Sequence, residues 1–251
     1  MKLSYQKWKG ICRYGLLPTY IVSKHIKIHQ PTLNQICDYG EQDYYSMIYN
    51  LTATPQSMKV QLWDAGIDYT KITAFELFSQ LLYKLYSKEK TSIIFGNLDF
   101  SKFKVGYKEN NGIELYQYVD NQLIEINEYT YNVIADYLRQ VHFINKDEKI
   151  PANETTKIIL IEDDREEMER NKNKEYHSQL KNLISSMINS EGFKYNHSQV
   201  WDMKINAFMD SVKRISKMKN ADLLLQSGYS GFGVNLKDID KKQLNWLGEL
   251  E

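Results

Sequence analysis

The 251-residue sequence contains only two cysteines, Cys12 and Cys37, and their spacing matches no disulfide framework and no zinc motif. Such low cysteine use fits a reducing compartment. The five histidines are scattered along the chain. His25 and His29 have the spacing of a helical metal pair, but they fall in a predicted strand, where about 3.3 Å per residue would separate them by about 13 Å. We therefore expect no metal and no cofactor.

The sequence also lacks an excess of charge of either sign. Lysine plus arginine number 32 and aspartate plus glutamate number 32, so the net charge is zero. A balanced chain has no overall attraction for phosphate polymers, and we expect no nucleic acid partner. The most basic segment holds Lys213, Arg214, Lys217 and Lys219, whose spacing is typical of the solvated face of an amphipathic helix.

Long apolar runs are missing as well. A membrane-spanning helix needs about 20 consecutive apolar residues, and the sequence has no such run. The basic first residues are not followed by the apolar core of a signal peptide. We therefore expect a cytoplasmic protein that does not bind membranes.

No set of reactive side chains stands out. The acidic run 162–167 lacks the alternating oxygen ligands and the turn glycine of a calcium loop, and its charge order is typical of a solvated helix. The segment 227–233 is one residue too short for a nucleophile elbow and lacks the Lys-Ser/Thr pair of a phosphate loop, so we interpret it as a helix stop. We predict no catalytic residues and no enzyme activity.

The apolar residues that are present follow helical spacing through most of the first 100 residues. Residues 24–30 alternate like a half-buried strand and end at Pro31. Helical spacing follows over 33–51, with Gly40 as a weak point, and a short helix begins at Pro55. Thr73 and Glu76 form a capping box ahead of another helix, whose apolar face runs to Leu85.

Beyond Lys90 the pattern changes to that of an antiparallel meander. Hydrophobic residues surround Gly96-Asn97, strands at 104–107 and 112–116 meet across a turn at 109–111, and a third strand follows at 122–126. Asn127 then caps a helix whose inner face includes Tyr131 and Leu138.

The polar segment 145–156 carries Pro151 and has no periodicity, so we predict a linker there. Helices are expected after it at 157–172, 176–189, 198–227 and 238–250. The predicted fold class is mainly α (α+β). An N-terminal helical domain, 1–145, contains a small β insertion near 100–126, and a C-terminal helical domain spans 156–251.

Three blocks together resemble a known family. They are residues 26–33 with 38–41, residues 61–69 running on to 75–78, and residues 189–195 continuing through 201–203 to 207–212. The set resembles proteins of the structural gene clusters of tailed phages and prophages of Gram-positive bacteria, and within those clusters it looks most like the tail assembly chaperones. The blocks span nearly the whole chain and consist of packing residues, without a catalytic motif.

The resemblance implies a non-enzymatic protein that coats the tape measure protein, recruits tail tube subunits and is absent from the finished virion. Family members commonly occur in a short form and a frameshift-extended form. The segment 145–156 would suit the junction between an oligomerising N-terminal part and a C-terminal extension, although the C-terminal part looks well packed for an extension.

Aromatic side chains are the expected contacts with such partners. The chain has 19 tyrosines, and tyrosine, tryptophan and methionine suit surfaces that are wet when free and buried when docked. A tyrosine-rich core would explain the same composition. The contact residues suggested for partner binding are Tyr44, Tyr45, Trp63, Tyr69, Trp201 and Phe208.

Two alternatives stay open from the sequence. The protein could be a permanent virion component of the neck, connector or baseplate, assembled as a homo-oligomer through tyrosine-rich faces. It could also be a metal-dependent phage enzyme that uses Asp163, Asp164 and Glu167.

Overall fold

The computed structural model describes residues 19–107, 112–230, 233, 235–248 and 250. The chain divides into two compact units. Unit 1 comprises the residues up to Pro31 together with Gln35–His177, and unit 2 comprises Thr32–Asn34 and Ser178–Glu251. Helices predominate, and the small antiparallel sheets lie in the N-terminal half, which confirms the predicted fold class.

Unit 1 opens with a two-stranded antiparallel ribbon, β1 (Thr19–Ile21) and β2 (Lys27–His29). The predicted alternation is present, because Ile26 and Ile28 are buried while Lys27 is exposed. Nδ1 of His29 lies 2.9 Å from the hydroxyl of Thr19, its partner in the register, so this histidine has a structural role in the ribbon.

The helical pattern of residues 33–51 forms two helices, α2 (Leu33–Tyr39) and α3 (Glu41–Leu51). They separate at Gly40, whose φ of +99° favours glycine because other residues are strained there. The weak point predicted at this glycine is therefore a real break, and it re-aims α3 so that Tyr44, Met47, Ile48 and Leu51 face the core.

Several short helical pieces follow. They are η1 (Gln56–Met58), α4 (Lys59–Asp64), α5 (Ala74–Leu77), η2 (Phe78–Leu82), η3 (Tyr83–Leu85), α6 (Lys88–Phe95) and η4 (Phe100–Lys102). The capping box is confirmed, since the Thr73 hydroxyl accepts from the Glu76 amide at 3.1 Å and the Glu76 carboxylate accepts from the Thr73 amide at 2.7 Å.

The continuous helix expected behind the capping box is wrong in detail. The chain changes from α-helical to π-helical geometry at Phe78 and to a 3₁₀ turn at Tyr83. The change of pattern expected at Lys90 also comes too early, because residues up to Phe95 remain helical in α6. Gly96, with φ +60°, ends that helix and separates it from the strands.

The three-stranded meander is confirmed. Strands β3 (Lys104–Tyr107), β4 (Ile113–Val119) and β5 (Gln122–Ile126) pair in the order β3-β4-β5. Asp120 and Asn121, both with positive φ, form the two-residue turn between β4 and β5. The turn predicted at 109–111 lies outside the described residues. The sheet packs its inner residues Leu115, Ile124 and Ile126 into the core.

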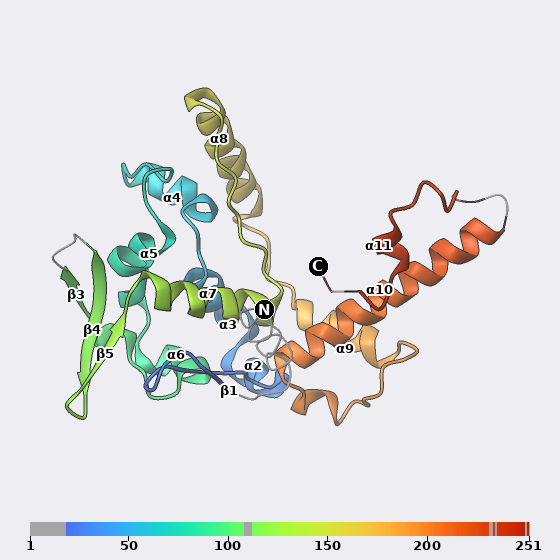
Figure 1. Cartoon of the computed structure of the whole chain (residues 1–251), viewed down its shortest axis with the longest axis horizontal. Helices are drawn as coiled ribbons and strands as arrows, with labels where there is room; N and C mark the ends of the chain where they lie inside the picture. Colours follow the sequence, from blue (N-terminus) through green and yellow to red (C-terminus); the bar gives the residue numbers. More distant parts are fainter. Residues whose placement is uncertain (1–18, 108–111, 231–232, 234, 249, 251) are drawn as a thin grey trace, which may run out of the picture. The chain divides into compact units, whose positions relative to one another are not determined.

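Helix α7 (Glu128–His142) begins at Asn127, whose side chain accepts from the Thr130 amide as the sequence predicts, and ends at Phe143 in the left-handed region. Figure 1 shows α7 running through the middle of unit 1, between the sheet and α3. Its Tyr131 stacks on Phe78 with ring centroids 4.8 Å apart, so α7 organises the aromatic core of this unit.

Helix α8 (Glu154–Asn171) begins within the polar segment 145–156, at the cap residue Asn153. The compact units divide after His177, so α8 lies in unit 1. This division differs from the predicted boundary at 145–156. A polar segment without periodicity predicts only that regular structure is interrupted there. Which unit α8 belongs to depends on its tertiary contacts, and α8 contacts α4 of unit 1.

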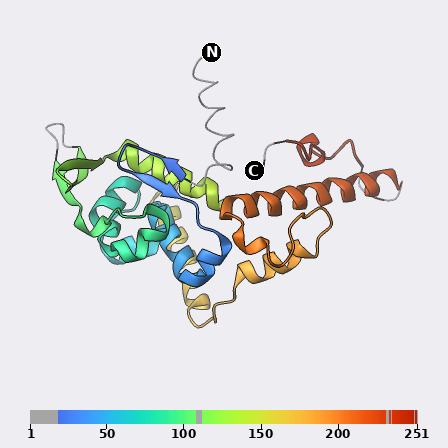
Figure 2. The same cartoon turned by 90° about the horizontal axis from the view of Figure 1, so that it is seen from below.

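Unit 2 contains α9 (Gln179–Ile188), η5 (Val200–Asp202), α10 (Ile205–Tyr229) and α11 (Lys241–Leu244). Figure 2 shows α10 as the long orange-red helix of this unit. Thr32 bridges Lys204, and the Leu33 amide donates to the Met203 carbonyl at 3.0 Å, so three residues from early in the chain complete unit 2. The buried apolar side chains of this unit are Leu33, Leu180, Ile184, Met187, Val200, Met203, Ile205, Phe208 and Ala221.

Two C-terminal helices differ from their predicted bounds. The helix expected from 198 begins at Ile205, because Asn196 holds the preceding residues in a capped turn and Met203 is extended. The helix expected over 238–250 is helical only at Lys241–Leu244. The helix stop predicted at 227–233 is present, because α10 ends within this segment, at Tyr229. Gly231 and Phe232 lie outside the described residues.

Candidate functional site: a groove beside helices α4 and α8

Three of the six residues suggested for partner binding belong to the core. Tyr44 and Phe208 are fully buried and Tyr69 is 1% exposed, so in this structure they cannot form a contact surface. Tyr44 packs against His142, and Phe208 lies edge-on to Phe193. The correction has a simple cause: an aromatic ring at helical spacing fits a core as well as an interface, and only tertiary contacts decide between them.

The other three residues reach the surface. Trp63 on α4 is 40% exposed, Trp201 in η5 is 36% exposed, and Tyr45 on α3 is half-buried. Trp63 and Tyr45 belong to unit 1, whereas Trp201 belongs to unit 2. Unit 1 thus holds two of the three candidates that reach the surface, and the candidate site lies in this unit.

Helix α3 presents a row of tyrosines. Tyr45 and Tyr49 are one helical turn apart and therefore share a face. Tyr176 lies beside them, because it forms a hydrogen bond with Glu41 of α3 and interacts with Tyr45. Burial, followed by this hydrogen bond and the Glu41 charge, raises the pKa of Tyr176 to about 12. Burial, then the Glu41 charge and the neighbouring Tyr176 and Tyr49, raises the pKa of Tyr45 well above its ordinary value. We call Tyr45 and Tyr49 with Tyr176 the α3 tyrosine row. The raised pKa values of Tyr45 and Tyr176 keep these two side chains neutral at ordinary pH.

Two adjoining cavities extend from this row along α4 and α8. One, of about 610 Å³, lies between α4 and α8, and the other, of about 370 Å³, lies between the end of α3 and residues 144–147. They share Ser57 and Gln61. We call the pair the α4–α8 groove, and its lining side chains include Tyr49, Met58, Val60, Glu167, Met168 and Lys172.

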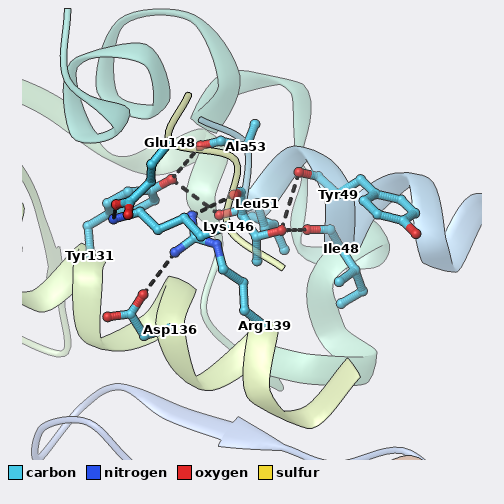
Figure 3. Close-up of polar contacts among 10 residues, drawn as sticks. Ile48, Tyr49, Leu51, Ala53, Tyr131, Asp136, Arg139, Lys146 and Glu148 are labelled. Atoms are coloured by element: carbon cyan, nitrogen blue, oxygen red, sulfur yellow. Dashed lines mark hydrogen bonds and ion pairs between the residues drawn. The ribbon is translucent and has the colours of Figure 1, made fainter. Parts of the chain in front are cut away.

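The groove ends on a rigid polar cluster at the carboxyl end of α3 (Figure 3). The guanidinium of Arg139, on α7, donates to the Thr52 carbonyl at 2.6 Å and to Asp136 at 2.9 Å. The Thr52 hydroxyl donates back to the Ile48 carbonyl at 2.8 Å. The Arg139 guanidinium thus satisfies the Thr52 carbonyl just beyond the end of α3. The Ile48 carbonyl accepts from both the amide and the hydroxyl of Thr52, so bonds within the chain hold this end of the groove.

Charged side chains hold α8 against α4. Lys59 pairs with Asp164, and Arg165 donates to both carboxylate oxygens of Asp64 at 2.7 and 3.0 Å. Lys157, the cation at the start of α8, lies 3.0 Å from Asp68, and its ammonium is 5.8 Å from the centre of the Trp63 ring. One wall of the groove is therefore attached through ion pairs.

Apolar burial contributes little to this attachment. Among the 18 residues of α8, those buried are Lys157 and Ile161. Hydrogen bonds reinforce the pairs instead. The pKa of the Asp68 carboxyl lies well below its usual range, because hydrogen bonds from the Thr70 hydroxyl and, to a lesser extent, from Lys157 outweigh the effect of burial. The Arg165 hydrogen bond lowers the pKa of Asp64 in the same way. The carboxyls of Asp64 and Asp68 are thus ionised at neutral pH.

The groove and the first turns of α8 carry exposed apolar side chains as well. Tyr49 is 57% exposed and Met168 is 47% exposed, and Ile158 and Ile159 on α8 are about half exposed. Sequence reasoning singled out neither Tyr49 nor Met168. The spacing of Tyr45 and Tyr49 would have pointed to Tyr49, whereas Met168 becomes a groove residue only because α8 docks on α4, which the sequence does not reveal.

Reactive groups do not converge here. Of the three acids considered for a metal-dependent enzyme, Asp164 pairs with Lys59, and Glu167 lines the groove beside Met168. In the described part of the chain, no group of three or more His, Cys, Asp and Glu side chains is placed to hold a metal ion. What the groove offers chemically is a mixed surface of aromatic, sulfur and carboxylate groups.

Unit 2 has its own exposed surface. Arg214 donates to the carbonyls of Trp246 and Gly248 at 2.6 and 2.9 Å, which fastens the last described residues to α10. Lys213 and Lys217 line a cavity of about 570 Å³ with Asp240 and Lys242. Half-exposed or exposed aromatic side chains in this unit are Tyr195, Trp201, Tyr229 and Trp246.

Comparison with known proteins gives one result. Residues 171–251 match the family model of the YomV second domain. YomV is a prophage-associated family, so the C-terminal part of this chain is similar to a domain of phage or prophage proteins. The matched segment includes all of unit 2 except Thr32–Asn34. No curated protein and no solved structure matches the chain.

Within the ranges that the structure describes, no helix is both long enough and apolar enough to cross a membrane.

Proposed function

We propose that this protein is a non-enzymatic phage morphogenesis factor, a tail assembly chaperone that binds the tape measure protein and recruits tail tube subunits. The similarity of residues 171–251 to a prophage-associated domain supports the phage setting. The finer role rests on the sequence resemblance to tail assembly chaperones and on the character of the surface. The observation that carries it is the α4–α8 groove, lined by exposed Tyr49 and Met168.

The groove suits a helical, apolar-striped polypeptide better than a small molecule. Tyrosine and tryptophan contribute much of the energy of protein interfaces, and methionine adapts to partners of different shape. Tyr49 and Met168 would contact the apolar stripe of a docked helix, while Glu167 would face its basic residues. Each contact is weak, which fits a chaperone that must later release its client.

Such weak sites would serve a physical need. A tape measure chain that awaits its tube exposes long apolar surfaces, and exposed apolar surface leads to aggregation. Many copies of a groove-bearing protein along that chain would cover the surface until the tube subunits replace them. Trp63 and Tyr45, next to the groove, would widen the contact in unit 1, and Trp201 offers a further contact in unit 2.

Co-expression with the tape measure protein of the same phage or prophage tests the proposal. We expect the tape measure protein to be soluble with the wild-type chain and to aggregate without it. The double variant Tyr49→Ala, Met168→Ala should lose this protection, while Tyr107→Ala, which removes a 76% exposed tyrosine far along the chain from the groove, should keep it.

Two results would overturn the proposal. One is a tape measure protein that is equally soluble with and without this chain. The other is the recovery of stoichiometric amounts of the chain from purified virions by mass spectrometry, which would indicate a permanent neck, connector or baseplate component instead.

A further inference from the structure

Strand β5 lies at an edge of the three-stranded sheet. The strand order is β3-β4-β5, so β5 pairs with β4 on one side only (Figure 1). It is the last strand before α7, and its side chains alternate between the core, with Ile124 and Ile126, and the solvent, with Leu123 and Glu125.

The register identifies the backbone groups that point away from β4. Val119 and Gln122 close the two-residue turn at Asp120-Asn121, so they form a hydrogen-bonded pair. Pairs alternate along an antiparallel ladder, so Ile124 also bonds to β4, whereas Leu123 and Glu125 direct their N–H and C=O groups to the open edge. No hydrogen bond from these four groups is formed within the described ranges.

This edge has few of the features that usually prevent pairing between chains: its charged side chain is Glu125, and it contains no proline or lysine. Proline, lysine, glycine and bulges are common on protected edges. Strand β3, at the other edge, contains Lys104 and Gly106, and the Tyr116 ring lies so close over Gly106 that a Cβ there would meet it at 3.0 Å. Strand β5, with the sequence QLIEI, has none of these residues.

The open edge is complementary to itself. If two copies approach antiparallel about a two-fold axis at Ile124, Leu123 of each copy lies opposite Glu125 of the other. The partial charges then match, since every outward N–H of one strand faces an outward C=O of its neighbour, and both strands keep their bonds to β4. An isologous contact of this kind needs no change of fold.

The side chains agree with the same register. On the inner face the two Ile124 residues become neighbours, which continues the apolar layer that each sheet already packs on its core. On the outer face, Leu123, which is 43% exposed, lies next to Glu125 of the other copy, and the two exposed Tyr118 rings flank the pair.

We propose that β5 is a dimerisation edge, through which a second copy of this chain adds its own β5 and extends the sheet. The inference goes beyond the proposed function and does not depend on it, because it concerns the chain's own assembly. A dimer would present two α4–α8 grooves, and paired sites bind a long client more tightly than single ones.

Sedimentation equilibrium of the full chain gives the first test. We expect a particle of twice the 29.6 kDa chain mass, in equilibrium with the monomer. A chain that stays monomeric up to its solubility limit would overturn the proposal, whether or not the protein protects a tape measure protein.

Opposite charges at Leu123 test the register. Leu123→Glu places two carboxylates side by side across the two-fold axis and should weaken the dimer about tenfold, because like charges directly opposite each other repel. Leu123→Lys places an ammonium beside Glu125 of the other copy and should leave the dimer intact or strengthen it. Both changes affect an exposed side chain, so the fold is preserved. Equal effects of the two variants would contradict the register.

Proline variants separate the two edges. Glu125→Pro removes an N–H that points to the open edge and leaves the ladder with β4 intact, so the monomer should fold and the dimer should be lost. Val105→Pro makes the same change on β3 and should not affect dimerisation. A dimer that survives Glu125→Pro, or one that is lost only in Val105→Pro, would assign the contact to another surface and overturn the proposal. Circular dichroism of each variant confirms folding.

Discussion

The hydroxyl of Tyr44 lies 2.7 Å from Nε2 of His142, and both side chains are buried. Nδ1 of the same ring is 2.7 Å from the Leu138 carbonyl, which can only accept, so Nδ1 carries the proton. Nε2 is therefore the acceptor and Tyr44 the donor. This chain of bonds links α3 to α7 through a neutral imidazole.

Removal of the donor should destabilise the fold. Tyr44→Phe leaves Nε2 of His142 buried without its partner, and an unsatisfied buried acceptor costs about 1–3 kcal/mol. Urea unfolding followed by circular dichroism measures the loss. Tyr45→Phe, which changes the half-buried neighbour, is the control, and an equal loss in both variants would contradict the assigned role of Tyr44.

The same imidazole makes stability depend on pH. Burial lowers the pKa of His142 from 6.5 to about 4, against the effect of the bond to Leu138. Between these values the unfolded chain binds a proton that the folded chain does not, so stability is full above pH 6.5 and falls as the pH drops towards 4. At about 1.4 kcal/mol per pKa unit, the loss approaches roughly 3 kcal/mol.

Urea unfolding at several pH values between 4 and 7 would reveal this slope. In His142→Gln, which cannot be protonated, stability should be lower overall, but its slope in this range should be reduced. A wild-type stability that stays constant from pH 7 to pH 4 would show that His142 is not the neutral, buried group described above.

Helix α8 should detach when its ion pairs are broken. Arg165→Glu replaces the two bonds to Asp64 with repulsion, and because few residues of α8 are buried, the pairs Lys59–Asp164 and Lys157–Asp68 are then left to oppose its detachment. Hydrogen exchange should accelerate in α8 and stay unchanged in α7. High salt should act in the same direction on the wild type, since exposed pairs are screened.

Arg170→Glu provides the matched control for α8. It makes the same charge change five residues further along the same helix, at an exposed residue. If this variant accelerates exchange as much as Arg165→Glu, the attachment depends on the overall charge of α8, and the specific pairing with Asp64 is refuted.

The break between α2 and α3 depends on a single glycine. Gly40 has φ +99°, a conformation that strains any residue with a Cβ, so Gly40→Ala should destabilise the protein by about 1–2 kcal/mol. Gly112→Ala, where a Cβ meets nothing within 4 Å, should be neutral within error. Thermal unfolding of the two variants decides, and a neutral Gly40→Ala would exclude the strained conformation.

Features with a local cause could be predicted from the sequence. The capping box at Thr73 and the cap at Asn127 need only residues three positions apart, and the turn at Asp120-Asn121 suits residues that tolerate positive φ. The meander followed from alternation and turn residues alone. The position of β5 at the edge also follows once the strand order is known.

Features that depend on distant contacts could not be predicted. Tyr44 and Tyr45 are adjacent in the sequence, and both rings lie near His142. Tyr44 is nevertheless fully buried and bonds to Nε2 of His142, whereas Tyr45 stays half-buried in the tyrosine row. The groove exists because Asp64 and Arg165, about 100 positions apart, form an ion pair, and no local pattern reports such a pair. The π-helical turn likewise begins at Phe78, whose ring stacks on the distant Tyr131.

The way in which Thr32–Asn34 complete unit 2 has a consequence for truncated forms. A fragment that starts at residue 171, the beginning of the YomV-like segment, would lack the bridge between Thr32 and Lys204 and the bond from Leu33 to Met203. Shortened versions of the protein, natural or designed, are then incomplete at the start of α10 unless the missing tripeptide is supplied.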